Sequence, residues 1–314
     1  MRVVITGGSG FLGAHLARAL IARGDTVTCL DVAPPSPLLA DLDPIAQVIC
    51  DVGSWAELAH VLKEAHPAVV FHTAGILSAS AEERPRAAWE ANATGTYNLL
   101  EAASLLGIRQ VVFTSTIATF GPGVARTVDE STQQRPTTLY GLSKVLGELL
   151  GEWVGARFGV DFRAVRLPAI IGPGRGAGGA SAYASLVVSR PARGQPYAVP
   201  VPEGTTVPLI SVEDAVRALV LLSEADPGRL RRRTYNVAGF SPSARELVDA
   251  VRRVLPDARL TFEPDEGISS IVGTWPERMA DREAATDWGW AASDDLDAAV
   301  SRFVTTLAAH PGWS

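Results

Sequence analysis

The stretch Thr6-Gly7-Gly8-Ser9-Gly10-Phe11-Leu12-Gly13 follows directly after the apolar residues 3–5 and carries four glycines. Glycine loses more conformational entropy on folding than any other residue, so this cluster at a strand end indicates a backbone that bends sharply or approaches a ligand closely. A helical run follows at 14–20, and its N-terminus would present unpaired N–H groups and positive dipole charge, which suit a diphosphate. The stretch therefore predicts a dinucleotide-binding turn formed by Gly7, Gly10, Phe11, Leu12 and Gly13.

Composition limits the class of protein. The chain has 314 residues, of which 47% are hydrophobic and 20% charged, so it can bury a large core as one large domain or two closely packed ones. The net charge of -6 and the pI of about 5.5 argue against nucleic acid as a partner, because phosphate binding needs a dense Lys/Arg surface. The short basic run Arg231-Arg232-Arg233 is interpreted as a solvated turn.

Cysteine and histidine usage indicates a reducing compartment and no metal site. Cys29 and Cys50 lie in apolar strand-like runs and are predicted to be small buried hydrophobes. The five histidines are scattered without the spacing of metal ligands. No apolar run reaches the ~18 residues that a membrane span needs, and the N-terminal run is typical of a strand. We therefore expect a cytoplasmic protein with a small-molecule substrate and no nucleic-acid or membrane partner.

Strand-like apolar runs alternate with helix-length stretches through the first half of the chain. Nearly all-apolar strands in such an alternation predict a parallel sheet covered by helices on both faces, the doubly wound α/β or Rossmann fold. The predicted strands are 3–6, 26–31, 46–50, 68–72, 110–115 and 162–167, and the helices between them include 54–65, 86–106 and 140–158.

The second half departs from this alternation. A glycine-rich loop at 172–179 and a Pro- and Gly-rich segment at 191–208 interrupt the pattern. The remaining predicted elements are a strand at 235–238 and helices at 244–254 and 295–307. We therefore expect a nucleotide-binding Rossmann domain over 1–167 and a smaller, mainly substrate-binding lobe over 168–314, from which some segments return to the sheet.

An acidic residue at the end of the second predicted strand indicates which dinucleotide binds. The carboxylate of Asp31 would accept hydrogen bonds from the adenosine ribose and repel a 2′-phosphate, so it predicts NAD rather than NADP. The alternative is an aspartate that caps a turn. Because strand, glycines and helix lie in register, the cofactor reading is favoured. Asp51 and Val52 are then expected near the adenine, and Ala74 and Gly75 beneath the cofactor.

Tyr140 and Lys144 predict the chemistry. The two residues are four apart on a predicted helix and therefore share one face. The lysine ammonium would lower the pKa of the phenol from ~10 toward the working pH, so that the tyrosine accepts the proton of a substrate hydroxyl. Ser115 and Thr116 supply hydroxyls at the end of a strand, at the sheet edge where ligands bind in open α/β folds.

At these residues the sequence resembles the extended short-chain dehydrogenase/reductase family of NAD-dependent epimerase/dehydratase type, along the whole chain. The resemblance implies that Thr116, Tyr140 and Lys144 are catalytic, that Lys144 also holds the nicotinamide ribose, and that Thr116 positions the substrate oxygen. It further implies cofactor contacts at Asn92, at the end of the fifth strand by Ser115, and at the backbone of Pro168.

Some segments resemble particular members of that family. The segments 76–79, 117–122 and 284–290 are similar to short-chain L-threonine 3-dehydrogenases, and 180–191 is similar to D-erythronate dehydrogenases. Both groups oxidise a secondary hydroxyl of a small polar acid with NAD. The run 177–184, AGGASAYA, lacks two threonines and an aspartate of the threonine dehydrogenases. The resemblance therefore implies a small hydroxy acid. The expected substrate contacts are Ser78, Thr116, Gly178, Gly179, Ser181 and Trp275, the last as part of a lid.

Two other functions and an assembly remain open at this point. A nucleotide-sugar epimerase would use the same three catalytic residues, but it needs more basic side chains than Arg175, Arg190 and Arg193 supply. A non-catalytic NAD sensor typically lacks the tyrosine or the lysine.

The apolar faces of 86–106 and 140–158 are expected to pair between subunits in a twofold homodimer. The alternative is that these faces only cover the sheet.

Overall fold

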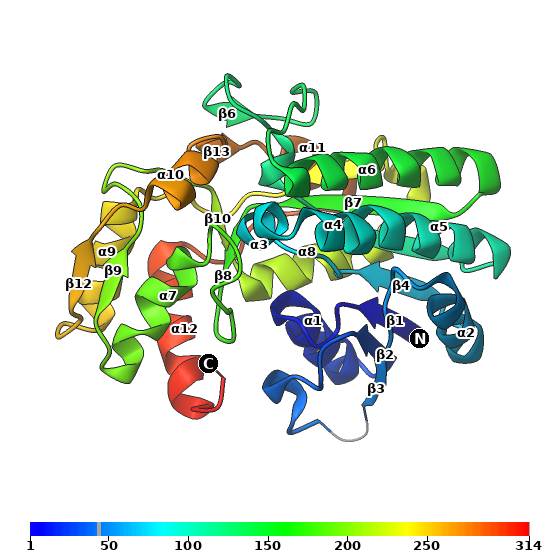
Figure 1. Ribbon diagram of the computed structural model, residues 1–314, viewed down its shortest axis with the longest axis horizontal. Helices are drawn as coiled ribbons and strands as arrows, with labels where there is room; N and C mark the ends of the chain where they lie inside the picture. The colour runs from blue at the N-terminus through cyan, green and yellow to red at the C-terminus, as the bar shows by residue number, and fades with distance from the viewer. Residues whose placement is uncertain (43–44, 314) are drawn as a thin grey trace.

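A seven-stranded parallel sheet forms the centre of the molecule in the computed structural model, which describes residues 1–42 and 45–313 (Figure 1). The strand order is β11-β7-β5-β4-β1-β2-β3, and every neighbouring pair is parallel. The strands are β1 (Arg2–Thr6), β2 (Thr26–Asp31), β3 (Ala46–Ile49), β4 (Val69–His72), β5 (Gln110–Thr116), β7 (Asp161–Leu167) and β11 (Thr234–Asn236). The predicted doubly wound fold is confirmed.

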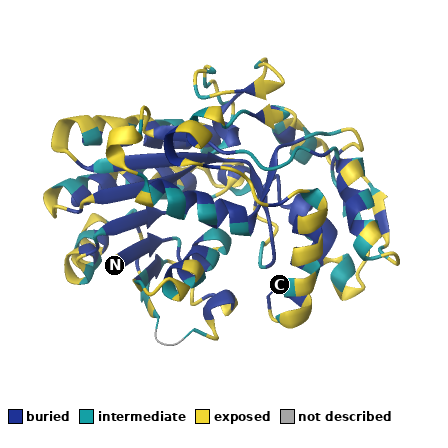
Figure 2. Cartoon of the chain, turned by 180° about the vertical axis from the view of Figure 1, so that it is seen from behind, coloured by how far each residue is buried: buried dark blue, intermediate teal, exposed yellow. Residues whose placement is uncertain are grey.

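Helices cover both faces of this sheet, because the strands are apolar on both sides. In β1, Val3 and Ile5 belong to the core on one face and Val4 to the core on the other. The first face is covered by α1 (Phe11–Ala22) and α8 (Val212–Glu224), and the second by α2 (Trp55–Ala65), α5 (Gly95–Leu105) and α6 (Leu139–Phe158). Figure 2 shows the strands buried and the outer faces of the helices exposed.

The predicted helix at 86–106 is present but contains a π-helical turn. It is divided into α4 (Pro85–Trp89), a π-helical turn (Glu90–Thr94) and α5. The side chain of Asn92 in the π-turn is buried, its Oδ1 accepts from the amide of Ile76 at 2.7 Å, and its Nδ2 donates to the carbonyl of Ile76 at 2.9 Å. The wider turn thereby lets one side chain hold the loop after β4, and such turns are frequent at functional sites.

Shorter elements stand beside the carboxyl ends of the strands (Figure 1). Three pairs of short parallel strands occur there: β8 (Ala169–Ile171) with β10 (Leu209–Ser211), β9 (Tyr197–Val199) with β12 (Leu260–Phe262), and β6 (Thr127–Val128) with β13 (Arg278–Met279). The helices of this part are α3 (Ser78–Glu83), α7 (Tyr183–Ser189), α9 (Ala244–Val254), α10 (Glu266–Val272), α11 (Arg282–Trp288) and α12 (Leu296–Ala309), with 3₁₀ turns at Pro37–Leu39, Ile117–Thr119, Pro191–Arg193 and Pro227–Arg229.

The structure bears on three interpretations of the composition: the buried cysteines, the solvated basic run and the membrane spans. Cys29 and Cys50 are free and buried, and burial raises the pKa of their thiols to about 12 and about 11. The basic run is more than a solvated turn, because Arg231, Arg232 and Arg233 form ion pairs with Asp287, Glu283 and Asp161 respectively. None of the helices built from the described residues is both long enough and apolar enough to cross a membrane.

Candidate active site

The glycine turn between β1 and α1 fits a dinucleotide. Gly7 has a φ of +72°, and a Cβ there would lie 2.6 Å from the amide nitrogen of Ala74. A Cβ on Gly13 would overlap the carbonyl of Gly7, so the turn and the first helical turn touch backbone to backbone. Gly10 is the N-cap of α1, and among the described residues no side chain caps it. The first amides of the helix are therefore free for a diphosphate.

Asp31 also shapes this turn. Its Oδ2 accepts a hydrogen bond from the amide of Ser9 at 3.0 Å, and its Oδ1 accepts one from the amide of Ala33 at 3.0 Å. The turn-capping role and the ribose-binding role are compatible, because an ionised carboxylate offers about four acceptor positions. Asp51 similarly accepts from the amide of Gly53 at 2.8 Å.

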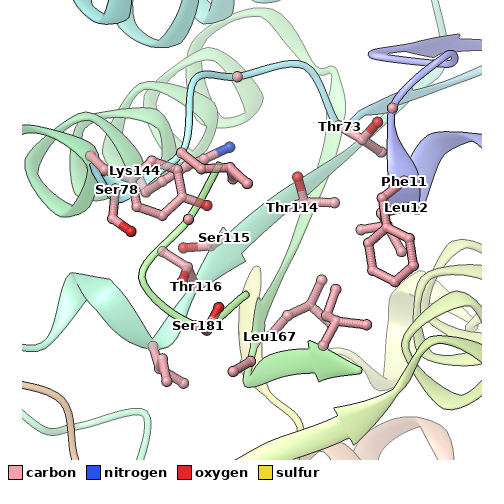
Figure 3. A pocket seen from close by; sticks show the side chains of 18 of the residues that line it. Phe11, Leu12, Thr73, Ser78, Thr114, Ser115, Thr116, Lys144, Leu167 and Ser181 are labelled. Carbon is pink, nitrogen blue, oxygen red and sulfur yellow. The ribbon is translucent and has the colours of Figure 1, made fainter. Parts of the chain in front are cut away.

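A cavity of about 200 Å³ lies at the carboxyl ends of β1, β4, β5 and β7 (Figure 3). The predicted residues that line it are Gly7, Gly10, Phe11, Leu12, Gly13, Gly75, Ser78, Ser115, Thr116, Tyr140, Lys144, Pro168, Gly179, Ser181 and Trp275. The predicted residues outside its lining are Asp31, Asp51, Val52, Ala74, Asn92 and Gly178. Sequence reasoning missed the lining residues Thr73, Leu77, Thr114, Ile117, Leu167, Ala169 and Ile170, and it named Arg175 only as one of three basic residues that could serve a nucleotide sugar.

Tyr140 stands in the first turn of α6, where Thr138 caps the helix by accepting from the amide of Gly141 at 3.2 Å. Burial raises the pKa of the Tyr140 phenol, and the charge of Arg175 and a hydrogen bond with Thr116 oppose that rise. Nζ of Lys144 lies 5.8 Å from the centroid of the Tyr140 ring. The groups that favour the phenolate in this structure come from the loop after β8 and the end of β5.

Lys144 lies one turn further along α6 and is only 4% exposed. Its Nζ stands 4.6 Å from the centroid of the Phe113 ring. Burial lowers the pKa of Lys144 to about 8, and the charge of Glu148 acts in the opposite direction. The ammonium points into the cavity from the same side as Ser78, while Phe11 and Leu12 stand on the opposite side (Figure 3).

Glu148, one turn beyond Lys144 on α6, forms a buried ion pair and hydrogen bonds beside the cavity. Its Oε2 pairs with Nη2 of Arg166 at 2.7 Å and accepts from Nε2 of Gln134 at 3.1 Å, and the hydroxyl of Ser115 donates to its Oε1. Such a pair is stable in a dry interior only when further hydrogen bonds satisfy its oxygens, which these do. The four-residue spacing from Lys144 was the available sequence signal for this residue.

A second buried chain of hydrogen bonds joins the glycine turn to the π-turn. Nδ1 of His72 lies 2.6 Å from Oγ1 of Thr6, its Nε2 lies 3.0 Å from Oγ1 of Thr96, and the Thr96 hydroxyl donates to the carbonyl of Asn92 at 2.6 Å. Thr96 therefore accepts from His72, which places the ring proton on Nε2. Burial lowers the pKa of His72 to about 3, so the ring is neutral.

Arg175 enters the cavity from the glycine-rich loop after β8. Its Nη2 donates to Oγ of Ser181 at 3.0 Å, and its guanidinium carbon lies 5.6 Å from the centroid of the Phe11 ring. Its Nε is buried and finds no acceptor among the described residues. Arg175 thus lines the cavity together with Ser181 and Tyr140.

Comparison with known proteins connects this site to a family. The model of the NAD dependent epimerase/dehydratase family matches residues 3–238. The mitochondrial L-threonine 3-dehydrogenase of Sus scrofa is 34% identical over 316 residues, covering 98% of this chain and 83% of its own length. The D-erythronate dehydrogenase of Cupriavidus necator is 34% identical over 321 residues, covering 97% and 98%. A solved GalE-like L-threonine dehydrogenase from Cupriavidus necator, in its holo form, superposes with a TM-score of 0.92 at 33% identity and covers 98% and 100%.

These matches extend over nearly the whole chain and agree with a glycine turn that fits a dinucleotide and with a sheet edge that carries a tyrosine and a lysine. The chain therefore belongs to the NAD-dependent epimerase/dehydratase family, within the extended short-chain dehydrogenases/reductases, and is an NAD-dependent oxidoreductase.

Proposed function

We propose that the protein oxidises the secondary hydroxyl of a small hydroxy acid. The observation that carries this proposal is Arg175, which lines the same cavity as Tyr140 and Thr116. A guanidinium binds a carboxylate through two parallel hydrogen bonds, so Arg175 supplies the group that an acid needs.

In this proposal Tyr140 is the general base. Its phenol takes the proton of the substrate hydroxyl, Thr116 orients the oxygen of that hydroxyl, and Lys144 holds the nicotinamide ribose and adds positive charge beside the phenol. NAD, when bound, supplies the acceptor for the hydride. Because burial raises the pKa of Tyr140, the base form becomes populated toward alkaline pH, and oxidation should accelerate in that direction.

The substrate contacts follow from the groups around the cavity. Ser78 and Ser181 are buried, and their hydroxyls are placed to bind the polar groups of the acid together with the amide of Gly179. Gly178, whose amide was also proposed, lies outside the lining of the cavity, and its carbonyl accepts from the hydroxyl of Ser80 at 3.1 Å. Trp275, half-buried after α10, closes the remaining side as a lid.

The cofactor contacts proposed from the sequence are refined in one respect. We retain Gly7, Asp31 and Pro168 as direct contacts, while Asn92 acts through the loop at Ile76 that it holds. We also propose that residues 1–167 form the nucleotide-binding part of the protein and that residues 168–314 form the mainly substrate-binding part. The free, buried cysteines fit the proposed cytoplasmic location.

A homodimer is part of the proposal. The α4–α5 face and the α6 face expose large apolar side chains, whose burial against a second copy would remove apolar area from water. These exposed residues are Trp89, Tyr97, Leu105, Leu142, Leu149 and Trp153.

The test is turnover of a substrate panel. L-threonine, D-erythronate, 3-hydroxybutyrate, uronates and UDP-hexoses are offered with NAD at alkaline pH, and NADH is followed by its absorbance. We expect NADH from one of the small acids. Tyr140→Phe, which removes only the ionisable oxygen, should lower kcat by roughly 10² to 10⁴ while NAD still binds.

Two outcomes contradict this function. Conversion of a UDP-hexose without net NADH would make the protein a nucleotide-sugar epimerase. NAD binding without turnover of any substrate, and without a difference between wild type and Tyr140→Phe, would favour a sensor.

A further inference from the structure

The loop that carries Arg175 packs against α1, the helix that follows the glycine turn, and against the 3₁₀ turn Pro37–Leu39. Gly174 has a φ of +87°, and a Cβ at this position would lie 2.8 Å from the side chain of Leu38, in the 3₁₀ turn after β2. The next residue is Arg175 itself. The backbone therefore turns sharply against a neighbouring element at the point where it sends the guanidinium into the cavity.

His15, one turn into α1, makes the polar contact that fixes this turn. Its Nε2 lies 2.9 Å from the carbonyl oxygen of Pro173 and donates to it, because a carbonyl only accepts. The His15 ring meets the Phe11 ring edge to face, with centroids 5.4 Å apart, and the Phe11 ring in turn faces the Arg175 guanidinium. His15 thus touches the Arg175 loop both through the backbone and through an aromatic neighbour.

Trp313 packs against His15. The two rings meet edge to face with centroids 5.6 Å apart, and Trp313 is stacked on His310 at 4.2 Å. The guanidinium of Arg18 lies 4.8 Å from the Trp313 centroid, and Nη2 of Arg193 donates to the Trp313 carbonyl at 2.7 Å. Trp313 is 8% exposed. Segments from three distant parts of the sequence therefore meet at one histidine.

We propose that His15, braced by Trp313, is a positioning residue that sets the place of Arg175 in the substrate cavity. The proposal rests on the function proposed above, in which Arg175 binds the substrate carboxylate. Since α1 also presents its N-terminal amides to the diphosphate, one helix places both the cofactor and the anion-binding group. The acid and the dinucleotide are then held at a fixed mutual position, as hydride transfer requires.

The first measurement follows the loop without needing a substrate. Hydrogen–deuterium exchange of the backbone amides of 172–182 is compared in wild type, His15→Ala and His15→Gln. The alanine variant should exchange faster in this segment, because the donor to Pro173 is lost. The glutamine variant should stay near wild type, since its amide reaches about as far as Nε2. Trp313→Ala should resemble His15→Ala, and Trp313→Phe should be intermediate.

The second measurement is kinetic and uses the best acid of the panel. His15→Ala should raise its KM about five- to tenfold, as expected for a lost hydrogen bond, with kcat and the Kd for NAD within about twofold of wild type. A merely structural role would instead lower thermal stability and weaken NAD binding together. His60→Ala and Trp55→Ala, both exposed on α2, are the matched controls and should change nothing.

Arg175→Met separates the two proposals. If it leaves the KM of the acid unchanged, the carboxylate role of Arg175 fails, and the exchange experiment still decides whether His15 holds the loop. If Arg175→Met raises the KM but His15→Ala changes neither the KM nor the exchange of 172–182, the positioning role is wrong. If His15→Ala does not fold, Trp313→Phe, which keeps an aromatic ring, and His15→Gln, which keeps a donor, replace it. The exchange of 172–182 and the KM of the acid then decide the question.

Discussion

Lys144 carries a cost in folding free energy that follows from its burial. Its pKa is about 8 in the folded protein and about 10.4 in an unfolded chain. Below pH 8 both states hold the proton, so the folded state bears the full cost of burying the charge. Between pH 8 and the unfolded pKa the folded state releases the proton first, and stability rises with pH.

Lys144→Met should therefore increase the free energy of unfolding at pH 7 by about 1–3 kcal/mol while abolishing turnover. The gain should shrink as the pH rises from 8 to about 10. Urea unfolding at pH 7 and at about pH 10 measures this gain in the free energy of unfolding. Lys63→Met on the exposed face of α2 is the control. A gain that stays constant with pH would contradict the assigned pKa.

Single residues differ in how far the sequence could predict them. The spacing of Tyr140 and Lys144 on one helix places both at the cavity, as predicted. The sequence identified Arg175 only as a basic residue and could not place it in the cavity, because the path of its loop is set by contacts with Leu38 and His15 from elsewhere in the chain. The burial that raises the pKa of the Tyr140 phenol, and the charge of Arg175 that opposes this rise, depend on the tertiary structure and could not be predicted from the spacing.

At the scale of elements, the central strands were predicted well because they are apolar runs buried on both faces, whereas the edge strand β3 is partly or fully exposed along its length. The π-turn at Glu90–Thr94 could not be read from such a pattern, since it depends on the bonds between Asn92 and Ile76. The short pairs such as β8 with β10 were also missed. Strands of three residues give too few positions for a period of two to be recognised.

The end of β2 provides a prediction for the cofactor. Asp31→Asn keeps an oxygen that can accept from the amide of Ser9, so the glycine turn should remain, but it removes the charge that repels a 2′-phosphate. The ratio of Kd values for NADP and NAD should fall roughly tenfold or more. Titration of each dinucleotide measures it directly. Equal ratios in wild type and variant would show that Asp31 serves the turn alone.

At the scale of the whole molecule, the exposed apolar faces predict the assembly. Leu149 and Trp153 on α6 are 60% and 52% exposed, although large apolar side chains usually avoid water. Light scattering at micromolar concentration should give twice the chain mass, and Leu149→Arg should shift the population to monomer. Ile49→Arg, at 65% exposure on β3, is the control and should leave the mass unchanged. A wild-type monomer would contradict the prediction.

The strand order has a consequence for biosynthesis. β7 is completed at Leu167, yet its neighbour β11 ends only at Asn236, so a growing chain presents the open edge of β7 for several seconds at ~5–20 residues per second. An open strand edge is a template for pairing with other nascent chains. β7 contains Asp161, Arg163 and Arg166, charges that a central strand seldom carries, and charged side chains on an open strand disfavour pairing with other chains.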